Sequence, residues 1–341
     1  MNSLGLKAGD WVEIRSREEI LTTLDAQGSL EGMPFMPEML RHCGRRLQVF
    51  KRAHKTCDTA EKTGGRSVPD TVHLAGVRCD GSTHGGCQAG CMIFWKSAWL
   101  RRVEPPRDTP SQRVGGDGAV PDVVRRGAYY SGEGGPEDSI RWRCQANELF
   151  RASSPLPWWD MRQYVEDLVS RNIGPAALLR GASFSIFRRL IEIGIGYRIL
   201  VGLYDGFARL VGISSFPLAL GSQKPTPTLE LGLQPGEWVR VKPWQEILAT
   251  LDANNRNRGL FFDVEATKFC GRTFRVLSRV TRILDERTGE MLNFKNPCIV
   301  LEQVWCGGEM SKHRVFCPRA IYPYFREIWL ERVLPPPTAV N

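Results

Sequence analysis

The sequence predicts a mainly β protein with additional α-helices, in which two small β units are joined by a helical connector. Two observations support this fold class. The segment 9–52 aligns without a gap on 236–279, at an offset of 227, and 18 of the 44 aligned pairs are identical. Between the two copies, the chain contains residues that begin helices, namely a capping box and a proline that follows a glycine. We therefore expect two related β units that flank a helical segment.

Each copy of the repeat is predicted to begin with a strand and a short helix. Residues 11–15 and 238–242 alternate apolar and polar side chains, as half-buried strands do. Residues 17–25 and 244–252 then place apolar residues at helical spacing. Further strands are predicted at 46–51 and 273–277, and a hairpin turn at 285–290. Each copy closes on a strand that ends Trp-Leu-x-Arg-Val.

The ends of the repeat divide the chain into segments. The offset is still 227 at Cys79 and Cys306 but becomes 230 afterwards, so that Cys87 aligns with Cys317. The predicted organisation is repeat 1 at 1–104, a flexible linker at 105–139, a helical connector at 140–212, a second linker at 213–231, repeat 2 at 232–334 and a tail at 335–341. In the connector, Asp160 and Gln163 predict a capping box, and Pro175 predicts the start of another helix.

The opening of each copy resembles a known class of small barrel. Gly9-Asp10-Trp11-Val12 and Gly236-Glu237-Trp238-Val239 are each followed by Gly-Arg-x-x-x-Val, at 44–49 and 271–276. These strand motifs resemble SH3-like barrels of the kind seen in translation factors and the nitrile hydratase β chain. The whole chain is similar to an uncharacterised bacterial family of tandem cysteine-rich repeats. The resemblance implies the barrel fold for each repeat and carries over no function or site residue.

Composition indicates an ordinary folded protein with an excess of basic charge. The 341 residues are 42% apolar and 24% charged, with a net charge of +9 and a pI near 9.2. Such a charge suits a nucleic acid, an anionic membrane surface or a phosphorylated substrate, although it also serves solubility alone. A basic run could form a phosphate-binding surface or a solvated strand face; it comprises Arg41, His42, Arg45, Arg46, Lys51, Arg52, His54 and Lys55.

The location of the protein is predicted from its termini and its apolar segments. The first residues show no basic region followed by an apolar run, so no signal peptide is recognised. The apolar stretch 184–210 is interrupted by charged residues, so it holds no uncharged run that is long enough to span a membrane. We expect it to pack against the β units, with a helix lying on a membrane surface as the alternative. The expected location is the cytoplasm, with peripheral attachment to a membrane as the alternative.

Ten cysteines suggest metal binding, because clustered thiols in a reducing compartment more often bind metal than form disulfides. Three positions are common to both copies: Cys43 and Cys270, Cys79 and Cys306, and Cys87 and Cys317. A tetrahedral zinc site needs four ligands, so each copy needs one more. The remaining candidates are Cys57, His84 and Cys91 in the first copy, and Cys298 and His313 in the second. For Cys43 and Cys270 the alternative is a buried, inert thiol.

These patterns predict a metal-binding accessory or scaffold protein that acts with a biosynthetic enzyme. Zinc is the first choice of metal and an iron–sulfur cluster the second, since sets of four cysteines serve both. A competing hypothesis is a metal- or thiolate-dependent enzyme centred on residues 79–91, with His84, Cys87 and Cys91 as its catalytic groups. A third hypothesis is a nucleic-acid-binding protein. A protein partner is expected under the first.

Overall fold

The computed structural model describes residues 4–61, 63–105, 119–193, 196–211, 220–310 and 316–335. The described chain divides into two compact units. Unit 1 takes its residues from Met1–Leu178, Arg282–Asn293 and His313–Ile321. Unit 2 takes its residues from Leu179–Thr281, Phe294–Lys312 and Tyr322–Asn341. The two units are described separately below.

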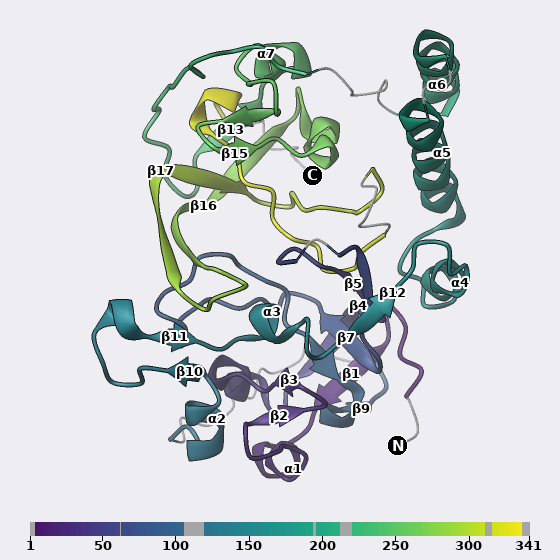
Figure 1. Cartoon of the computed structure of the whole chain (residues 1–341). Helices are drawn as coiled ribbons and strands as arrows, with labels where there is room; N and C mark the ends of the chain where they lie inside the picture. The colour runs from purple at the N-terminus through teal and green to yellow at the C-terminus, as the bar shows by residue number, and fades with distance from the viewer. Residues whose placement is uncertain are drawn as a thin grey trace. The chain divides into compact units, whose positions relative to one another are not determined.

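Unit 1 is built on a five-stranded antiparallel sheet (Figure 1). The strand order is β8 (Trp95–Lys96), β7 (Thr71–Leu74), β4 (Arg46–Arg52), β1 (Trp11–Ile14) and β9 (Leu100–Arg102). The central strand β1 pairs Val12 with Leu47 on β4 and with Arg102 on β9. The alternation of β1 places Val12 and Ile14 in the core. The strand predicted from this alternation is therefore present, and it forms the middle of a sheet.

Unit 2 repeats this strand pairing. Its four-stranded sheet has the order β17 (Met291–Leu301), β16 (Thr273–Leu284), β13 (Trp238–Val241) and β18 (Leu330–Arg332). Val239, which aligns with Val12, pairs with Phe274 on β16 and with Arg332 on β18. Both partners are those that the sequence offsets of 227 and 230 require. The chain thus combines helices with antiparallel sheets, and the finer assignment to SH3-like barrels stays a prediction.

Two aligned tryptophans, Trp99 and Trp329, lie in the cores of unit 1 and unit 2. The indole Nε1–H of Trp99 donates to Thr23 Oγ1 at 3.0 Å, and Phe35 meets the ring edge-on at 5.2 Å. In unit 2 Trp329 donates to Thr250 at 2.9 Å. Both tryptophans are fully buried. A buried indole N–H usually has a hydrogen-bond partner, and the threonine of the repeat supplies one to this tryptophan in each copy.

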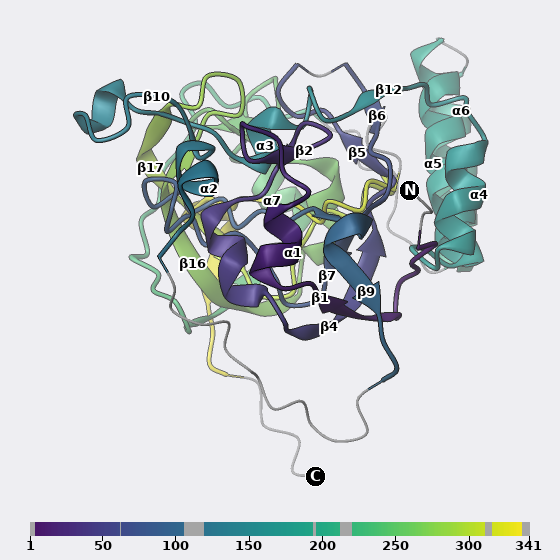
Figure 2. The ribbon, with the colours of Figure 1, turned by 90° about the horizontal axis from the view of Figure 1, so that it is seen from below.

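Short helices follow the first strands, as the sequence predicts. They are α1 (Arg17–Leu21) in unit 1 and α7 (Trp244–Leu248) in unit 2. The hydroxyl of Ser16 accepts the Glu19 N–H at 3.2 Å, and the Glu19 carboxylate accepts the Ser16 N–H at 2.9 Å. This reciprocal capping box explains why α1 begins at Arg17. Figure 2 shows α1 from below, close to β1 and β9.

Smaller elements complete the two units. In unit 1 they are the sheet β12 (Ser154–Leu156), β6 (Gly65–Ser67) and β5 (Lys55–Cys57), the pair β10 (Tyr129–Ser131) and β11 (Arg141–Trp142), and the pair β2 (Ser29–Leu30) and β3 (Met33–Pro34). Its other helices are α2 (Asp122–Arg126), α3 (Gln145–Glu148) and α4 (Arg162–Val169). Unit 2 adds the pair β14 (Arg256–Asn257) and β15 (Leu260–Phe261).

The connector holds helices, but one predicted cap is wrong. Helix α4 begins at Arg162, and Asp160 Oδ1 accepts the Arg162 backbone N–H at 3.1 Å. The Gln163 amide donates to the Pro157 carbonyl at 2.9 Å, so Asp160 and Gln163 do not form a capping box. The helix predicted from Pro175 is present as α5 (Pro175–Glu192).

Helix α6 (Tyr197–Val211) lies beside α5 in unit 2, where Phe184 of α5 meets Tyr204 of α6 at 6.0 Å (Figures 1 and 2). This small apolar cluster also includes Val264 and Met310 of unit 2. The helices therefore have packing partners, as the sequence predicts. None of the described helices combines the length and the apolar character needed to cross a membrane.

Two segments from repeat 2 belong to unit 1. In the turn between β16 and β17, the Gly289 carbonyl accepts the Trp142 N–H at 2.9 Å. The Arg282 carbonyl accepts the Gln88 N–H at 3.1 Å, and the Arg282 N–H donates to the Gln88 side-chain oxygen at 3.2 Å. The segment that carries Cys317 and Arg319 also belongs to unit 1. The compact units consequently do not coincide with the boundaries of the sequence repeats.

His73 of β7 should make unit 1 sensitive to acid. The ring is fully buried, Nδ1 faces the Ile93 carbonyl at 2.9 Å, and Nε2 has no partner among the described residues. Burial lowers the pKa of His73 to about 3. Because the folded pKa lies below the unfolded one, stability is present above pH ~6.5 and is lost as the pH falls. Between pH 7 and pH 5 we expect protonation of His73 in the unfolded chain to lower the free energy of unfolding by about 2 kcal/mol.

The measurement is urea unfolding of the full chain at several pH values between 7 and 5, for the native protein and for His73→Asn. Over this interval the free energy of unfolding of the variant should fall by about 2 kcal/mol less than that of the native protein, whatever the stability of the variant at pH 7. An identical pH dependence in both proteins would show that His73 does not contribute.

Candidate metal centre

The candidate site begins with a carboxylate that the fold turns inward. Pro37 opens the 3₁₀ helix η1 (Pro37–His42), and the next residue, Glu38, has a fully buried side chain. A buried carboxylate is costly unless hydrogen-bond donors surround it. The donors come from the glycine-rich loop at residues 79–91.

The loop folds back on itself through backbone hydrogen bonds. The Gly81 carbonyl accepts the N–H groups of His84 and Gly86, both at 2.9 Å, and the Cys79 N–H donates to the Cys91 carbonyl at 2.8 Å. Gly81 has a φ of +70°. Glycine adopts this left-handed conformation without the steric cost of a Cβ. The turn brings Cys79 and His84 to the same side of the loop, opposite Glu38.

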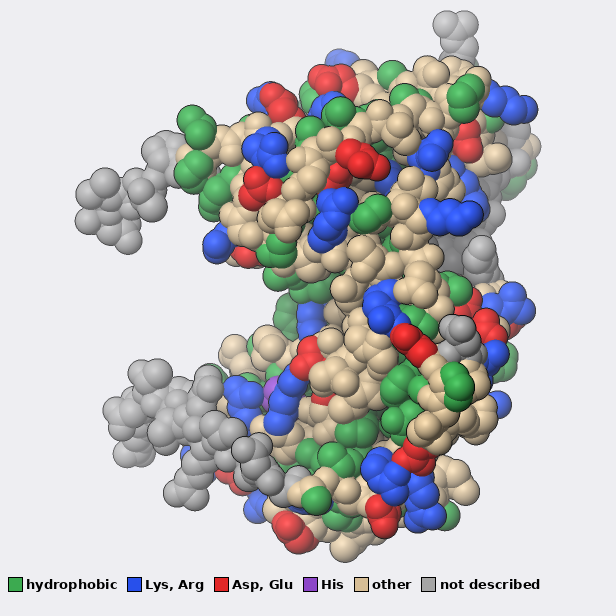
Figure 3. Space-filling view, turned by 90° about the vertical axis from the view of Figure 1, so that its left-hand side faces the viewer, with side chains coloured by type: hydrophobic (Ala, Val, Ile, Leu, Met, Phe, Trp, Pro, Cys, Tyr) green, Lys and Arg blue, Asp and Glu red, His purple; other side chains and the backbone are tan. Residues whose placement is uncertain are grey.

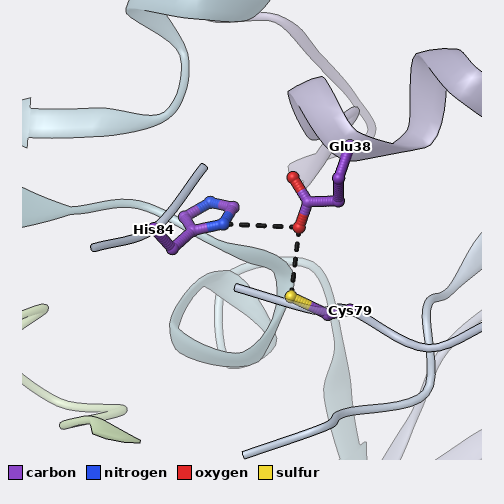
Figure 4. Close-up of side chains that lie close together, drawn as sticks. All are labelled: Glu38, Cys79 and His84. Atoms are coloured by element: carbon purple, nitrogen blue, oxygen red, sulfur yellow. Dashed lines mark hydrogen bonds and ion pairs between the residues drawn. The ribbon is translucent and has the colours of Figure 1, made fainter. Parts of the chain in front are cut away.

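Three side chains meet at this point (Figure 4). The Cys79 Sγ lies 3.1 Å from Glu38 Oε1, and the His84 Nδ1 lies 3.3 Å from the same oxygen. The other oxygen of Glu38 accepts a hydrogen bond from the Thr83 hydroxyl. Among the described residues, Glu38, Cys79 and His84 form the one group of three metal-ligand side chains whose donor atoms all lie within 4.8 Å of one another.

Electrostatics favour a charged carboxylate at the centre. Burial opposes ionisation of Glu38, but hydrogen bonds from His84, Thr83 and Cys79 together hold its pKa below the ordinary value. Burial and the neighbouring Glu38 charge raise the pKa of Cys79, so that without a cation the sulfur stays a thiol. A divalent cation would let Cys79 bind as a thiolate, because the cation compensates the Glu38 charge and takes the place of the thiol proton.

The three donors fit zinc. One nitrogen, one sulfur and one oxygen make a mixed set that zinc accepts, and zinc bonds of about 2.0–2.3 Å at tetrahedral angles place donor atoms about 3.3–3.8 Å apart. The observed separations of 3.1 and 3.3 Å are close to this. His84 Nε2 lies 3.1 Å from the Arg143 carbonyl. A metal-binding histidine commonly donates its second N–H to such an acceptor.

A small cavity adjoins the three residues. Its volume is ≈ 40 Å³, and its walls include Cys79, His84 and three further thiols, Cys87, Cys91 and Cys144. Burial raises the pKa of all three thiols, that of Cys91 to about 11. The sequence prediction named Cys87 and Cys91 but missed Cys144, which lies outside the repeat and has no aligned counterpart to mark it.

Among the described residues, no hydrogen bond joins the His84 ring to the Cys87 thiol, although the Cys87 backbone N–H donates to the His84 carbonyl at 3.2 Å. The His84 ring nitrogens face Glu38 and the Arg143 carbonyl, while the Cys87 Sγ accepts the Leu284 N–H at 3.3 Å. The ring therefore faces the carboxylate rather than the thiol. This geometry supports His84 as a metal ligand more than as a base for Cys87.

The other predicted ligands lie apart from this centre. Cys43 and Cys270 follow equivalent 3₁₀ helices, η1 and η4 (Val264–Phe269), where they pack against the cores, and burial raises the pKa of each to about 11. Cys298 is buried in unit 2, which also holds Cys306. His313 lies outside the described residues.

The second repeat does not assemble a matching site among its described residues. Cys317 belongs to unit 1, whereas Cys270 and Cys306 belong to unit 2. Glu265, the counterpart of Glu38, has Lys268 Nζ 3.4 Å from its carboxylate and also accepts the Met310 N–H. A lysine beside this carboxylate supplies the positive charge that the cation would supply in unit 1.

Glu38 is the candidate ligand that sequence reasoning missed. The sequence alignment does single out this position, because Glu38 and Glu265 are identical in the aligned copies. A glutamate is usually on the surface, so an identical pair of glutamates carries less chemical information than a pair of cysteines. Only its burial against Cys79 and His84 marks Glu38 as a candidate ligand.

The basic run of the first repeat is largely paired. Arg46 pairs with Glu13 at 2.9 Å, and Arg52 with Glu166 at 2.8 Å. Lys55 is buried against an aspartate of α4. On the face in Figure 3, basic and acidic side chains are interspersed rather than gathered into one basic patch. Paired cations leave little unbalanced charge for a phosphate backbone.

The chain matches no protein-family model, no curated protein and no solved structure. The function is therefore inferred from the residues and their geometry.

Proposed function

We propose that this protein binds one zinc ion through Glu38, Cys79 and His84. The observation that carries the proposal is the meeting of three ligand side chains of different kinds on one buried carboxylate oxygen. Zinc binds such mixed sets, whereas iron–sulfur clusters are held by sets of cysteine thiolates. The accessory role beside a biosynthetic enzyme, predicted from the sequence, is retained as part of the proposal.

A second candidate function is metal-dependent catalysis. Catalytic zinc sites have three protein ligands and keep a fourth position for water or substrate, whereas structural sites usually have four. Here Cys79 and His84 both line the cavity of ≈ 40 Å³, which offers space beside the ligands. A zinc-bound water in that space would ionise near neutral pH.

The test is zinc binding by the full chain, purified under reducing, anaerobic conditions. We expect one zinc ion per chain. The zinc affinity should fall by at least about 100-fold in Cys79→Ser and in His84→Gln, since even residues that only hydrogen-bond to a metal ligand contribute about 10- to 100-fold. Competition with a chromophoric chelator measures the affinity. Cobalt substitution should show a single thiolate-to-metal charge-transfer band that Cys79→Ser abolishes.

Cys270→Ser is the matched control, because Cys270 is the aligned counterpart of Cys43 and lies in unit 2. It should bind zinc as the native chain does. Native zinc affinity in both ligand variants would contradict the proposal. So would a brown, iron-containing preparation whose colour depends on Cys144, since that result would assign the thiol-lined cavity to a cluster.

A further inference from the structure

A second pair of cysteines lies within unit 1, apart from the zinc ligands. Cys57 ends β5, and Cys317 lies 260 residues further along the chain. The Cys57 backbone N–H donates to the Cys317 Sγ at 3.2 Å. Both residues are buried, with 2% and 5% of their surface exposed. The fold therefore brings two thiols from distant segments next to each other.

The surroundings of Cys317 are electropositive. Arg319, two residues further on, is 2% exposed, and its guanidinium donates to Thr59 Oγ1 at 2.8 Å and to Glu286 Oε1 at 2.6 Å. Burial opposes ionisation of Cys317, but hydrogen bonds from the Cys57 thiol and from backbone N–H groups, with the charge of Arg319, lower its pKa. A thiolate is the nucleophilic form of cysteine.

A pocket is lined by one of the two cysteines. The pocket has a volume of ≈ 120 Å³, and Cys317 lines it together with Lys55, Trp158 and Gln163. Cys57 does not line it. A small molecule that enters this pocket therefore meets Cys317 first, with Cys57 next to it as a second thiol.

We propose that Cys317 and Cys57 form a dithiol site that exchanges with small, low-molecular-weight disulfides. Cys317 is the attacking thiol, since it lines the pocket, and Cys57 is the resolving thiol. Such an arrangement combines a nucleophilic sulfur, a neighbouring thiol and an opening large enough for the end of a small disulfide.

The exchange proceeds in two balanced steps. The Cys317 thiol gives its proton to water, and its thiolate attacks one sulfur of the small disulfide. A mixed disulfide forms on Cys317 as the S–S bond of the small disulfide breaks, and the first thiolate leaves and takes a proton from water. The Cys57 thiol then loses its proton to water and attacks the Cys317 sulfur, which expels the second thiolate to be protonated in turn. The protein pair loses two electrons and two protons, and the small disulfide becomes two thiols.

This site shares no residue with the zinc ligands, and its test is independent of them. The reduced full chain is treated near neutral pH with a limiting amount of iodoacetamide, and the modified cysteines are mapped by peptide mass. We expect Cys317 to be alkylated at least about tenfold faster than Cys298, which is also buried and lies 3.5 Å from the Arg326 guanidinium but has a pKa raised by burial.

Oxidised glutathione is the disulfide probe. The native chain should form the Cys57–Cys317 disulfide, whereas Cys57→Ser should stop at the mixed disulfide between glutathione and Cys317. Cys317→Ser should show neither product, and Cys298→Ser should behave as the native chain does. The proposal is overturned if Cys317 reacts no faster than Cys298, or if Cys57→Ser accumulates no glutathione on Cys317.

Discussion

Replacing Gly81 with alanine is expected to destroy the proposed zinc site although Gly81 is not a ligand. Gly81 has a φ of +70°, and an added Cβ would overlap the Cys87 carbonyl oxygen and lie 2.7 Å from the carbonyl carbon and the nitrogen of Cys87. Backbone atoms cannot move aside as a flexible side chain can. The turn that holds His84 must therefore open, which should cost about 2–4 kcal/mol of stability.

Zinc affinity and urea unfolding are both measured, because opening of the turn should lower the zinc affinity and the stability together. We expect Gly81→Ala to weaken zinc binding at least about 100-fold, as removal of a ligand would. Gly86→Ala is the matched control. Gly86 has a φ of +74°, but an added Cβ would have no atom within 4 Å, so only the backbone cost of about 1–2 kcal/mol applies. Native zinc affinity in Gly81→Ala would show that the turn does not position the ligands.

Removal of Asp167 is expected to destabilise unit 1 by about 3–5 kcal/mol, since it leaves a buried lysine without its partner. The Lys55 Nζ of β5 lies 2.5 Å from Asp167 Oδ2 of α4, and both side chains are almost completely buried. Burial raises the pKa of Asp167 to about 6 and lowers that of Lys55. Each charge therefore depends on the other, and Asp167→Ala exposes the full cost of burying the ammonium.

The control is Glu166→Ala, one residue earlier on the same helix. Glu166 pairs with Arg52 at 2.8 Å, but both side chains are partly exposed, so its loss should cost no more than about 1 kcal/mol. Lys55→Met combined with Asp167→Leu should recover much of the stability that Asp167→Ala loses, because apolar side chains carry no buried charge. Equal destabilisation by Asp167→Ala and Glu166→Ala, measured by urea unfolding, would contradict this account.

Two of the three candidate zinc ligands could be predicted from the sequence. Cys79 and His84 stand in one glycine-rich loop, and their residue types alone suggest a metal. Glu38 lies 41 residues earlier than Cys79. No local sequence pattern predicts that the Glu38 carboxylate faces the loop, because its direction is determined by the packing of η1 on the core of unit 1.

The sequence by itself determined the repeat and the register of its strands. Val12 and Val239 occupy equivalent places in two sheets because the alternation of apolar residues permits one orientation of each strand toward a core. Local chemistry also determined where α1 begins, through Ser16 and Glu19. These features depend on neighbours close in the chain, which a single sequence displays directly.

Only the tertiary structure decided which thiols meet. The sequence alignment groups Cys317 with Cys270 and Cys306, yet the fold places it in unit 1 beside Cys57. It likewise brings Cys144 to the cavity that Cys79 lines. The reason is physical: contacts between distant segments form when whole elements bury their apolar faces together, and the spacing of cysteines along the chain does not encode that packing.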